Sequence, residues 1–148
     1  MVGRLARYLR AAGVDTEYIP GLSDDEIVRR VTVAGRVLVT RDRALAQRLP
    51  GSILLASPQL DMQWRAIARA IPELPHDVAF ARCTLCNGPL ARSLPAEADR
   101  SRPDLPWPRI ETGLPLFRCS TCGHLYWEGS HTARLRVALQ RWTPAESP

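Results

Sequence analysis

Four cysteines form two Cys-x-x-Cys pairs, and their spacing points to metal binding. The pairs are Cys83 with Cys86 and Cys119 with Cys122, each followed by a glycine within two positions. Cysteines at this spacing in a tight turn can present both sulfur atoms to one ion, so two pairs complete a tetrahedral zinc site. We expect a structural zinc ion, with glycines that allow the positive φ of each turn. Two disulfides or a redox-active pair are the alternatives, and the matched pairs favour zinc.

Two groups of carboxylates follow predicted strands. Asp42 comes directly after the apolar run 36–40, while Asp24 and Asp25 follow a short predicted strand at 16–19. Ligands of parallel α/β sheets bind beyond the carboxyl ends of the strands. Carboxylates there could hold Mg²⁺ or Mn²⁺ and activate water for phosphodiester cleavage. Each acid also has a structural explanation, because Asp24 and Asp25 favour a helix N-terminus and Asp42 could cap the helix that begins at 43.

The elements that must position these carboxylates alternate between helix and strand. Apolar periodicity predicts helices over 2–12 and 59–71. Helices are also expected over 24–34 and 43–49, and strands over 16–19, 36–40 and 52–56. Ser23 and Glu26 have the spacing of a capping box at the second helix. Asp15 is expected to fix the loop after the first helix by local hydrogen bonds. This alternation predicts a parallel sheet with right-handed crossovers. Three strands make a thin sheet, and a further strand is expected before the first helix.

The second half of the chain reads as a zinc ribbon followed by a helix. Residues 87–118 contain six of the 13 prolines, so we expect a loop with edge strands and neither a helix nor a central strand. Strands are predicted at 116–118 and 124–127, on either side of the second cysteine pair. Ser130 is expected to cap a helix over 131–142. The predicted domains are therefore an α/β domain at 1–75, a zinc ribbon at 76–129, a C-terminal helix at 130–142 and a disordered tail at 143–148.

The composition excludes some chemistries. The chain has 148 residues and a formal net charge of +5, and its basic residues are 20 arginines with no lysine. A Schiff-base lysine and a Walker-A lysine are therefore excluded. Arginine suits phosphate and nucleobase contacts, although codon bias in a GC-rich genome would also produce this composition. We expect no membrane span and no signal peptide, and hence a cytoplasmic protein.

Arginine and aromatic residues indicate candidate RNA contacts. Arg4, Arg7 and Arg10 recur on the first helix, either as a solvated face or as a stripe that contacts RNA phosphates. Near the ribbon, Trp127 or Tyr126 could stack on RNA bases. The alternative is that both aromatic rings pack the small core of the ribbon. Other candidate contacts in this region are His124, Arg118, Arg134 and Arg136.

In combination, these features resemble the Mut-seven C-terminal RNase domain family, in which a PIN-related nuclease domain is fused to a four-cysteine zinc ribbon. The resemblance covers Met1 to about Arg134. It is carried by Gly3-Arg4-Leu5-Ala6-Arg7-Tyr8-Leu9-Arg10, Gly13-Val14-Asp15-Thr16, Asp24-Asp25-Glu26, Leu38-Val39-Thr40-Arg41-Asp42, Arg82-Cys83-Thr84-Leu85-Cys86-Asn87-Gly88, Cys119-Ser120-Thr121-Cys122-Gly123 and Tyr126-Trp127-Glu128-Gly129-Ser130-His131.

The resemblance implies a PIN-like sheet and a metal-dependent ribonuclease activity. It makes Asp42 a ligand of Mg²⁺ or Mn²⁺, makes Asp24 or Asp25 a second one, and places Arg41 on the scissile phosphate. The family begins with a strand ending in Asp, whereas Met1 falls where the first helix begins. We therefore expect either an upstream start codon or a degraded copy. The alternative function is an RNA-binding protein without catalysis that has lost one catalytic Asp.

Overall fold

The computed structural model describes residues 2–98 and 100–143, and the chain divides into two compact units. Unit 1 comprises Met1–Ala6, Glu17–Leu74 and Arg141–Pro148, and unit 2 comprises Arg7–Thr16 and Pro75–Gln140. Two helices, α1 (Val2–Ala11) and α6 (Ser130–Trp142), contribute residues to both units. The domain limits expected from the sequence stay predictions. Beyond Thr143, the predicted tail lies outside the described residues.

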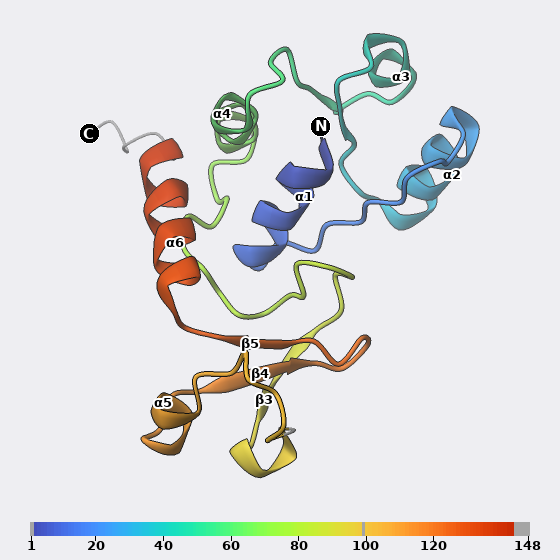
Figure 1. The fold of residues 1–148 in the computed structure, drawn as a ribbon. Helices are drawn as coiled ribbons and strands as arrows, with labels where there is room; N and C mark the ends of the chain where they lie inside the picture. Colours follow the sequence, from blue (N-terminus) through green and yellow to red (C-terminus); the bar gives the residue numbers. More distant parts are fainter. Residues whose placement is uncertain (1, 99, 144–148) are drawn as a thin grey trace. The chain divides into compact units, whose positions relative to one another are not determined.

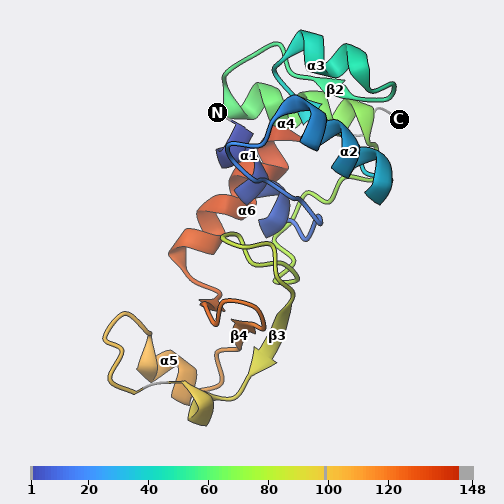
Figure 2. The ribbon, with the colours of Figure 1, turned by 90° about the vertical axis from the view of Figure 1, so that its right-hand side faces the viewer.

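Unit 1 is a small α/β arrangement around two short parallel strands (Figures 1 and 2). Strands β1 (Val39–Thr40) and β2 (Ile53–Leu54) pair with Val39 opposite Ile53. Besides the first residues of α1, unit 1 contains three helices. They are α2 (Asp24–Ala34), α3 (Arg43–Arg48) and α4 (Leu60–Ala70). The predicted parallel α/β pairing is therefore confirmed, although the sheet is smaller than expected.

The sheet is small because one predicted strand does not form and the other two are shorter than expected. The run 16–19 contains no strand: the Thr16 N–H donates to the Asn87 side chain, and the Thr16 carbonyl accepts from Arg10, so neither group is available to a neighbouring strand. In the run 36–40 the ladder begins only at Val39, and Val37 is 55% exposed.

Local capping and burial place the helices of unit 1. The Ser23 hydroxyl accepts from the Glu26 N–H at 3.3 Å, which is half of the predicted capping box. The Glu26 carboxylate binds arginines of its own helix. Helix α2 ends at Gly35, whose φ of 61° is left-handed. Helix α4 buries Trp64 completely, and the Trp64 indole N–H donates to the Thr143 hydroxyl at 3.1 Å.

Unit 2 contains a three-stranded antiparallel sheet with β4 in the centre (Figure 1). Its strands are β3 (Leu90–Ser93), β4 (Leu116–Cys119) and β5 (Leu125–Trp127). The sheet shares a core with the connection between β3 and β4. The members of that core are Ala98, Leu105, Ile110, Leu116 and Leu125.

The proline-rich run 87–118 was expected to contain neither a helix nor a central strand, and both expectations are wrong. It contains a helix, and its last residues begin β4, the central strand of the sheet. Helix α5 spans Trp107–Glu111, and a 3-10 turn spans Pro95–Glu97. Pro108 is tolerated because it lies in the first turn of α5, where its missing N–H would have no helical partner. Ile110 then packs into the core of unit 2. No helix among the described residues is long and apolar enough to cross a membrane.

Candidate metal centre and separate acidic groups

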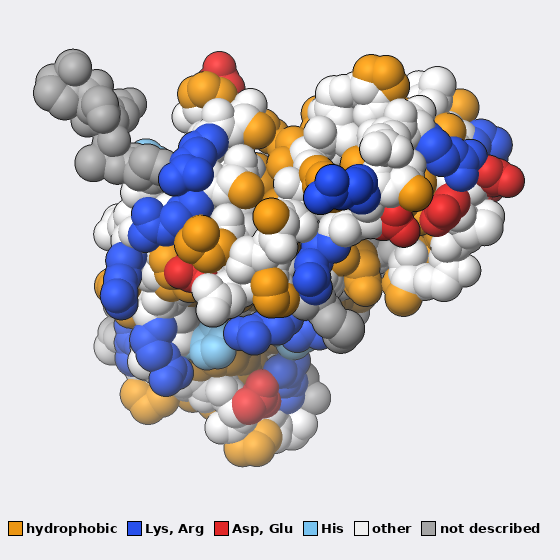
Figure 3. Space-filling model, turned by 90° about the horizontal axis from the view of Figure 1, so that it is seen from above, with side chains coloured by type: hydrophobic (Ala, Val, Ile, Leu, Met, Phe, Trp, Pro, Cys, Tyr) orange, Lys and Arg blue, Asp and Glu red, His pale blue; other side chains and the backbone are white. Residues whose placement is uncertain are grey.

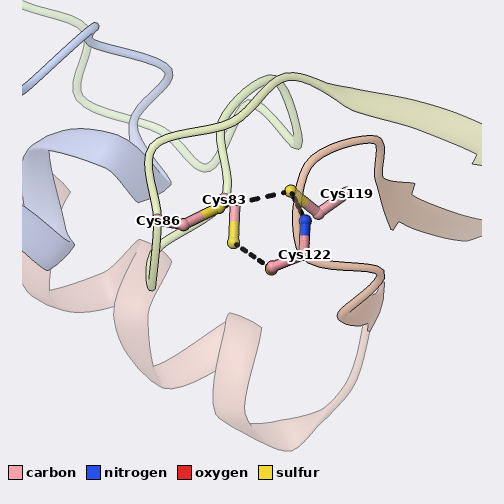
Figure 4. A group of neighbouring side chains, drawn as sticks. All are labelled: Cys83, Cys86, Cys119 and Cys122. Atoms are coloured by element: carbon pink, nitrogen blue, oxygen red, sulfur yellow. Dashed lines mark hydrogen bonds between the residues drawn. The ribbon is translucent and has the colours of Figure 1, made fainter.

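The four cysteine sulfur atoms lie within 4.8 Å of one another (Figure 4). The Sγ atoms of Cys83 and Cys122 are 3.6 Å apart, and those of Cys86 and Cys119 are 3.5 Å apart. Zinc bonds sulfur at about 2.3 Å in a tetrahedron, which separates the sulfur atoms by about 3.8 Å. The geometry and the soft sulfur donors fit one zinc ion, as the Cys-x-x-Cys spacing predicted.

The two cysteine loops, residues 83–88 and 119–124, share one backbone pattern. The first cysteine of each loop donates its N–H to the carbonyl five residues later, from Cys83 to Gly88 at 2.8 Å and from Cys119 to His124 at 2.9 Å. Each loop also has a left-handed residue after its second cysteine. That residue is Asn87 (φ 67°) in the first loop and Gly123 (φ 75°) in the second. The same turn thus presents both pairs of sulfur atoms.

Gly88 has a different role from the one predicted. The positive φ of the first loop occurs at Asn87, an amino acid that tolerates this conformation. At Gly88, an added Cβ would lie 2.8 Å from the Cys119 sulfur and would also collide with the Thr121 side chain. Glycine is therefore required because the two loops approach each other closely.

Backbone N–H groups shape the acidity of the thiols. Burial raises the pKa of Cys119, but the N–H groups of Cys122 and Thr121 point at its sulfur and bring the pKa to about 6. The Gly88 N–H lowers the pKa of Cys86, but burial and the neighbouring sulfur atoms raise it to about 12. Metal binding requires each thiol to release its proton and become a thiolate.

Tyr126 is fixed beside the cysteines by its hydroxyl group. This hydroxyl lies 3.1 Å from the Cys83 sulfur and accepts from the Thr84 N–H at 3.1 Å. Burial and the Cys83 sulfur raise the pKa of Tyr126 to about 12. These contacts favour the structural interpretation of Tyr126 that the sequence left open.

Arg10 is a structural residue that the sequence analysis assigned to an exposed face. Its side chain is only 5% exposed and donates to the carbonyls of Thr84 at 3.2 Å and Leu85 at 3.0 Å, both within the first cysteine loop. A helix turns by about 100° per residue, so a three-residue spacing drifts by about 60° per step. This drift separates Arg10 from Arg4, and it was the available signal that the three arginines do not share one face.

Asp15 and Asn87 join the end of α1 to the same loop. The Asn87 amide donates to Asp15 at 2.6 Å and accepts from the Thr16 N–H at 3.0 Å. Arg82 places a guanidinium nitrogen 3.7 Å from the Asp15 carboxylate. Asp15 therefore has long-range contacts that the sequence did not predict.

The acids assigned to catalysis lie apart from the cysteines in the chain and have local roles. Asp42 caps α3, and its Oδ1 accepts from the Leu45 N–H at 2.9 Å, as the structural alternative predicted. The exposed Asp25 forms an ion pair with Arg48. Asp24 opens α2 and makes no hydrogen bond or ion pair within the described part of the chain.

These acids form no three-ligand cluster. Over residues 2–98 and 100–143, the four cysteines are the only group of three or more His, Cys, Asp or Glu side chains close enough to hold an ion. In this structure the three carboxylates therefore do not form a binding site for Mg²⁺ or Mn²⁺. The catalytic role of Asp24, Asp25 and Asp42 stays a prediction.

Among the candidate RNA contacts, Arg4, Arg7 and Arg41 are exposed, whereas Trp127 is half-buried. Arg4, Arg7 and Arg41 make no hydrogen bond or ion pair with the described residues. Trp127 packs against the core of unit 2. Arg136, by contrast, is bound to Asp77 and Glu128. The face seen in Figure 3 carries its arginines in several groups.

A protein-family model matches most of the chain. The model of the Mut7-C RNAse domain family matches residues 1–139 of the 148-residue chain. This range contains both cysteine pairs and all three candidate acids. Comparison with curated proteins and with solved structures gave no match.

Proposed function

Because the chain belongs to the Mut7-C RNAse domain family, its function is related to that of ribonucleases, and we propose that it hydrolyses phosphodiester bonds of RNA with Mg²⁺ or Mn²⁺. The observation that carries this proposal is the family match over residues 1–139. RNA is accordingly the substrate, and the cytoplasm is the location we propose.

Asp42 is the acid on which we expect cleavage to depend most strongly. It follows β1 at the carboxyl end of the parallel pair, where ligands of such sheets bind. Its cap contact uses Oδ1, and Oδ2 makes no hydrogen bond or ion pair with the described residues. Asp24 and Asp25 are the further carboxylates, and Arg41 is the candidate phosphate contact. A divalent ion, when bound, would supply an activated water molecule and stabilise the leaving oxygen.

The metal at the four cysteines is a separate, structural zinc ion in this proposal. All four protein ligands are cysteines, which leaves no open coordination position for a substrate. Support comes from the sulfur distances and from the matched loops. The ion would stabilise the small sheet of unit 2.

A second candidate function is RNA binding without cleavage. The observation that favours it is that the three acids form no cluster among the described residues. In this case Arg4, Arg7 and Trp127 would contact RNA, and binding would weaken steeply with added salt. Nuclease activity would be absent at every metal concentration.

Cleavage of a labelled single-stranded RNA tests the proposal directly. The zinc-loaded protein should cut the RNA with added Mn²⁺ or Mg²⁺, and Asp42→Asn should lower the rate by at least about 100-fold. The matched control is Asp61→Asn, an acid in the first turn of α4 that lies outside the candidate site. The absence of cleavage by the wild-type protein, with RNA still bound, would favour the second candidate.

A further inference from the structure

A cavity of about 190 Å³ lies within unit 2, and all of its lining residues belong to that unit. The lining combines rings from Tyr8, Phe80, Tyr126 and Trp127 with cationic Arg7. We propose that this cavity binds one unstacked nucleotide of single-stranded RNA, with the base among the aromatic rings and a phosphate on Arg7. This inference rests on the proposed function for the identity of the ligand as RNA.

The aromatic walls of the cavity are held in place by other contacts. The Phe80 ring stacks on Phe117 with centroids 4.8 Å apart and an angle of 12° between the planes. The Tyr126 hydroxyl is bound at Cys83 and Thr84, and the Tyr126 ring packs edge-on against His124. Walls fixed in this way lose little side-chain freedom when a flat ring enters, which favours binding of a base.

Three polar groups of the cavity, by contrast, have no partner among the described residues. Within the described part of the chain, neither the Arg7 guanidinium nor the His131 ring makes a hydrogen bond or ion pair, and the indole N–H of Trp127 has no acceptor. These groups can bind a phosphate and an acceptor atom of a base.

Charge distinguishes a nucleotide from an apolar side chain of a protein partner. The lining contains Arg7 and Arg82 and no Asp or Glu. Arg82 is partly neutralised by Asp15, so Arg7 is the side chain left to attract an anion. An apolar peptide would leave this positive charge without a partner.

The size and shape requirements point to a single base from a single strand. A volume of about 190 Å³ is below the range of about 300–1,000 Å³ typical of pockets for larger ligands. Bases in a duplex are stacked and paired, whereas those of a single strand can turn outward onto aromatic side chains. The cavity is therefore a binding subsite, and it contains none of the three candidate catalytic acids.

Binding can be measured separately from cleavage. In an Asp42→Asn background loaded with zinc, the probe is a fluorescein-labelled oligouridylate of eight nucleotides, and its anisotropy is followed at several salt concentrations. Arg7→Gln should lower the salt slope of log affinity by about 0.7, the value for one phosphate contact on a single strand. Arg109→Gln, an exposed arginine of unit 2 outside the cavity, should leave the slope unchanged.

The base is tested with an otherwise identical oligomer whose nucleotides are abasic. The Asp42→Asn protein should bind this oligomer roughly 10-fold more weakly, because base stacking is lost. Since Trp127 also packs against the core, the second measurement needs no variant: an oligomer containing 4-thiouridine should crosslink on irradiation to peptides carrying Trp127 or His131.

Each of three results would overturn the proposal that the cavity binds a nucleotide. The first is an equal salt slope for Arg7→Gln and Arg109→Gln, and the second is equal affinity for the abasic oligomer and the oligouridylate. The third is crosslinks only to residues outside the cavity lining. If the protein cleaves RNA but gives these results, only the proposal for the cavity fails. If the protein binds RNA through the cavity but never cleaves it, only the proposal of nuclease activity fails.

Discussion

At the scale of single residues, the cysteine centre is supported by side chains that are not metal ligands. Arg10 binds two carbonyls of the first cysteine loop, and Asn87 bridges Thr16 and Asp15. These contacts fasten the end of α1 to the loop that carries Cys83. The stability of the metal centre should therefore depend on residues more than 70 positions earlier in the chain.

Replacing Arg10 with glutamine should destabilise the zinc-loaded protein by about 2 kcal/mol. The shorter side chain leaves the Thr84 and Leu85 carbonyls without their charged donor. Denaturant unfolding monitored by circular dichroism measures the loss. Arg7→Gln, on the same helix but exposed, should change the free energy of unfolding by less than about 0.5 kcal/mol. If the two substitutions changed the free energy of unfolding equally, the buried contacts of Arg10 would contribute nothing to stability.

The two glycines of the cysteine loops should respond differently to substitution. Gly88→Ala should lower zinc affinity by at least about tenfold, because its Cβ would collide with Cys119 and Thr121. Gly123→Asn should retain affinity within about threefold, since an added Cβ there meets no atom within 4 Å and Asn87 adopts the same conformation. Competition with a chromophoric zinc chelator measures both, and a tolerated Gly88→Ala would contradict the close approach of the loops.

At the scale of elements, helix ends determine where the candidate acids lie. Asp42 begins α3, and Asp25 in the first turn of α2 binds Arg48 in the last turn of α3. Helix α2 thus meets α3 through an exposed ion pair, which contributes little to stability by itself. The acidic side chains serve the helices whether or not they also bind an ion.

Two substitutions of Asp42 can distinguish its role in capping α3 from a role in catalysis. Asp42→Ala should lower the free energy of unfolding by about 1 kcal/mol, because the Leu45 N–H loses its acceptor. Asp42→Asn should cost only a few tenths of a kcal/mol, since asparagine caps equally well. Thermal unfolding of the two variants provides the measurement. If Asn destabilises as much as Ala, the charge of Asp42 matters to the fold.

The sequence predicts these elements well where the determining contacts are local. Cysteine spacing predicts the four-cysteine cluster. The capping box and Gly35 place the ends of α2, and apolar periodicity places α4 to within a residue of its observed ends. The run 16–19 does not form a strand, because distant Asn87 captures the Thr16 N–H. Burial of Arg10 likewise depends on carbonyls that only the folded chain brings near. Whether the three acids converge is a tertiary property that no spacing encodes.

At the scale of the whole molecule, the two units have different sources of stability. Unit 1 has an apolar core that includes Trp64, Ile67, Leu45 and Leu55. Unit 2 has a small apolar core and the cysteine centre. Small modules often need a metal ion to fold, so zinc should matter mainly to unit 2.

Removal of zinc should therefore affect the two units unequally. After treatment with a strong chelator, amide hydrogen exchange should accelerate by at least about tenfold in β3, β4 and β5, and much less in α4. Mass spectrometry of peptides resolves these regions, and restoring zinc should reverse the change. Equal acceleration throughout would show that the units unfold as one.

Tyr126 takes part in both the cysteine cluster and the cavity, because its hydroxyl contacts the Cys83 sulfur and its ring forms part of the cavity wall. Any occupant of the cavity and any ion at the cysteines therefore meet at one side chain. Thermodynamic reciprocity then requires that the factor by which the ion changes affinity for the occupant equals the factor by which the occupant changes affinity for the ion. Zinc titrations with and without an oligonucleotide would give the same coupling constant as oligonucleotide titrations with and without zinc.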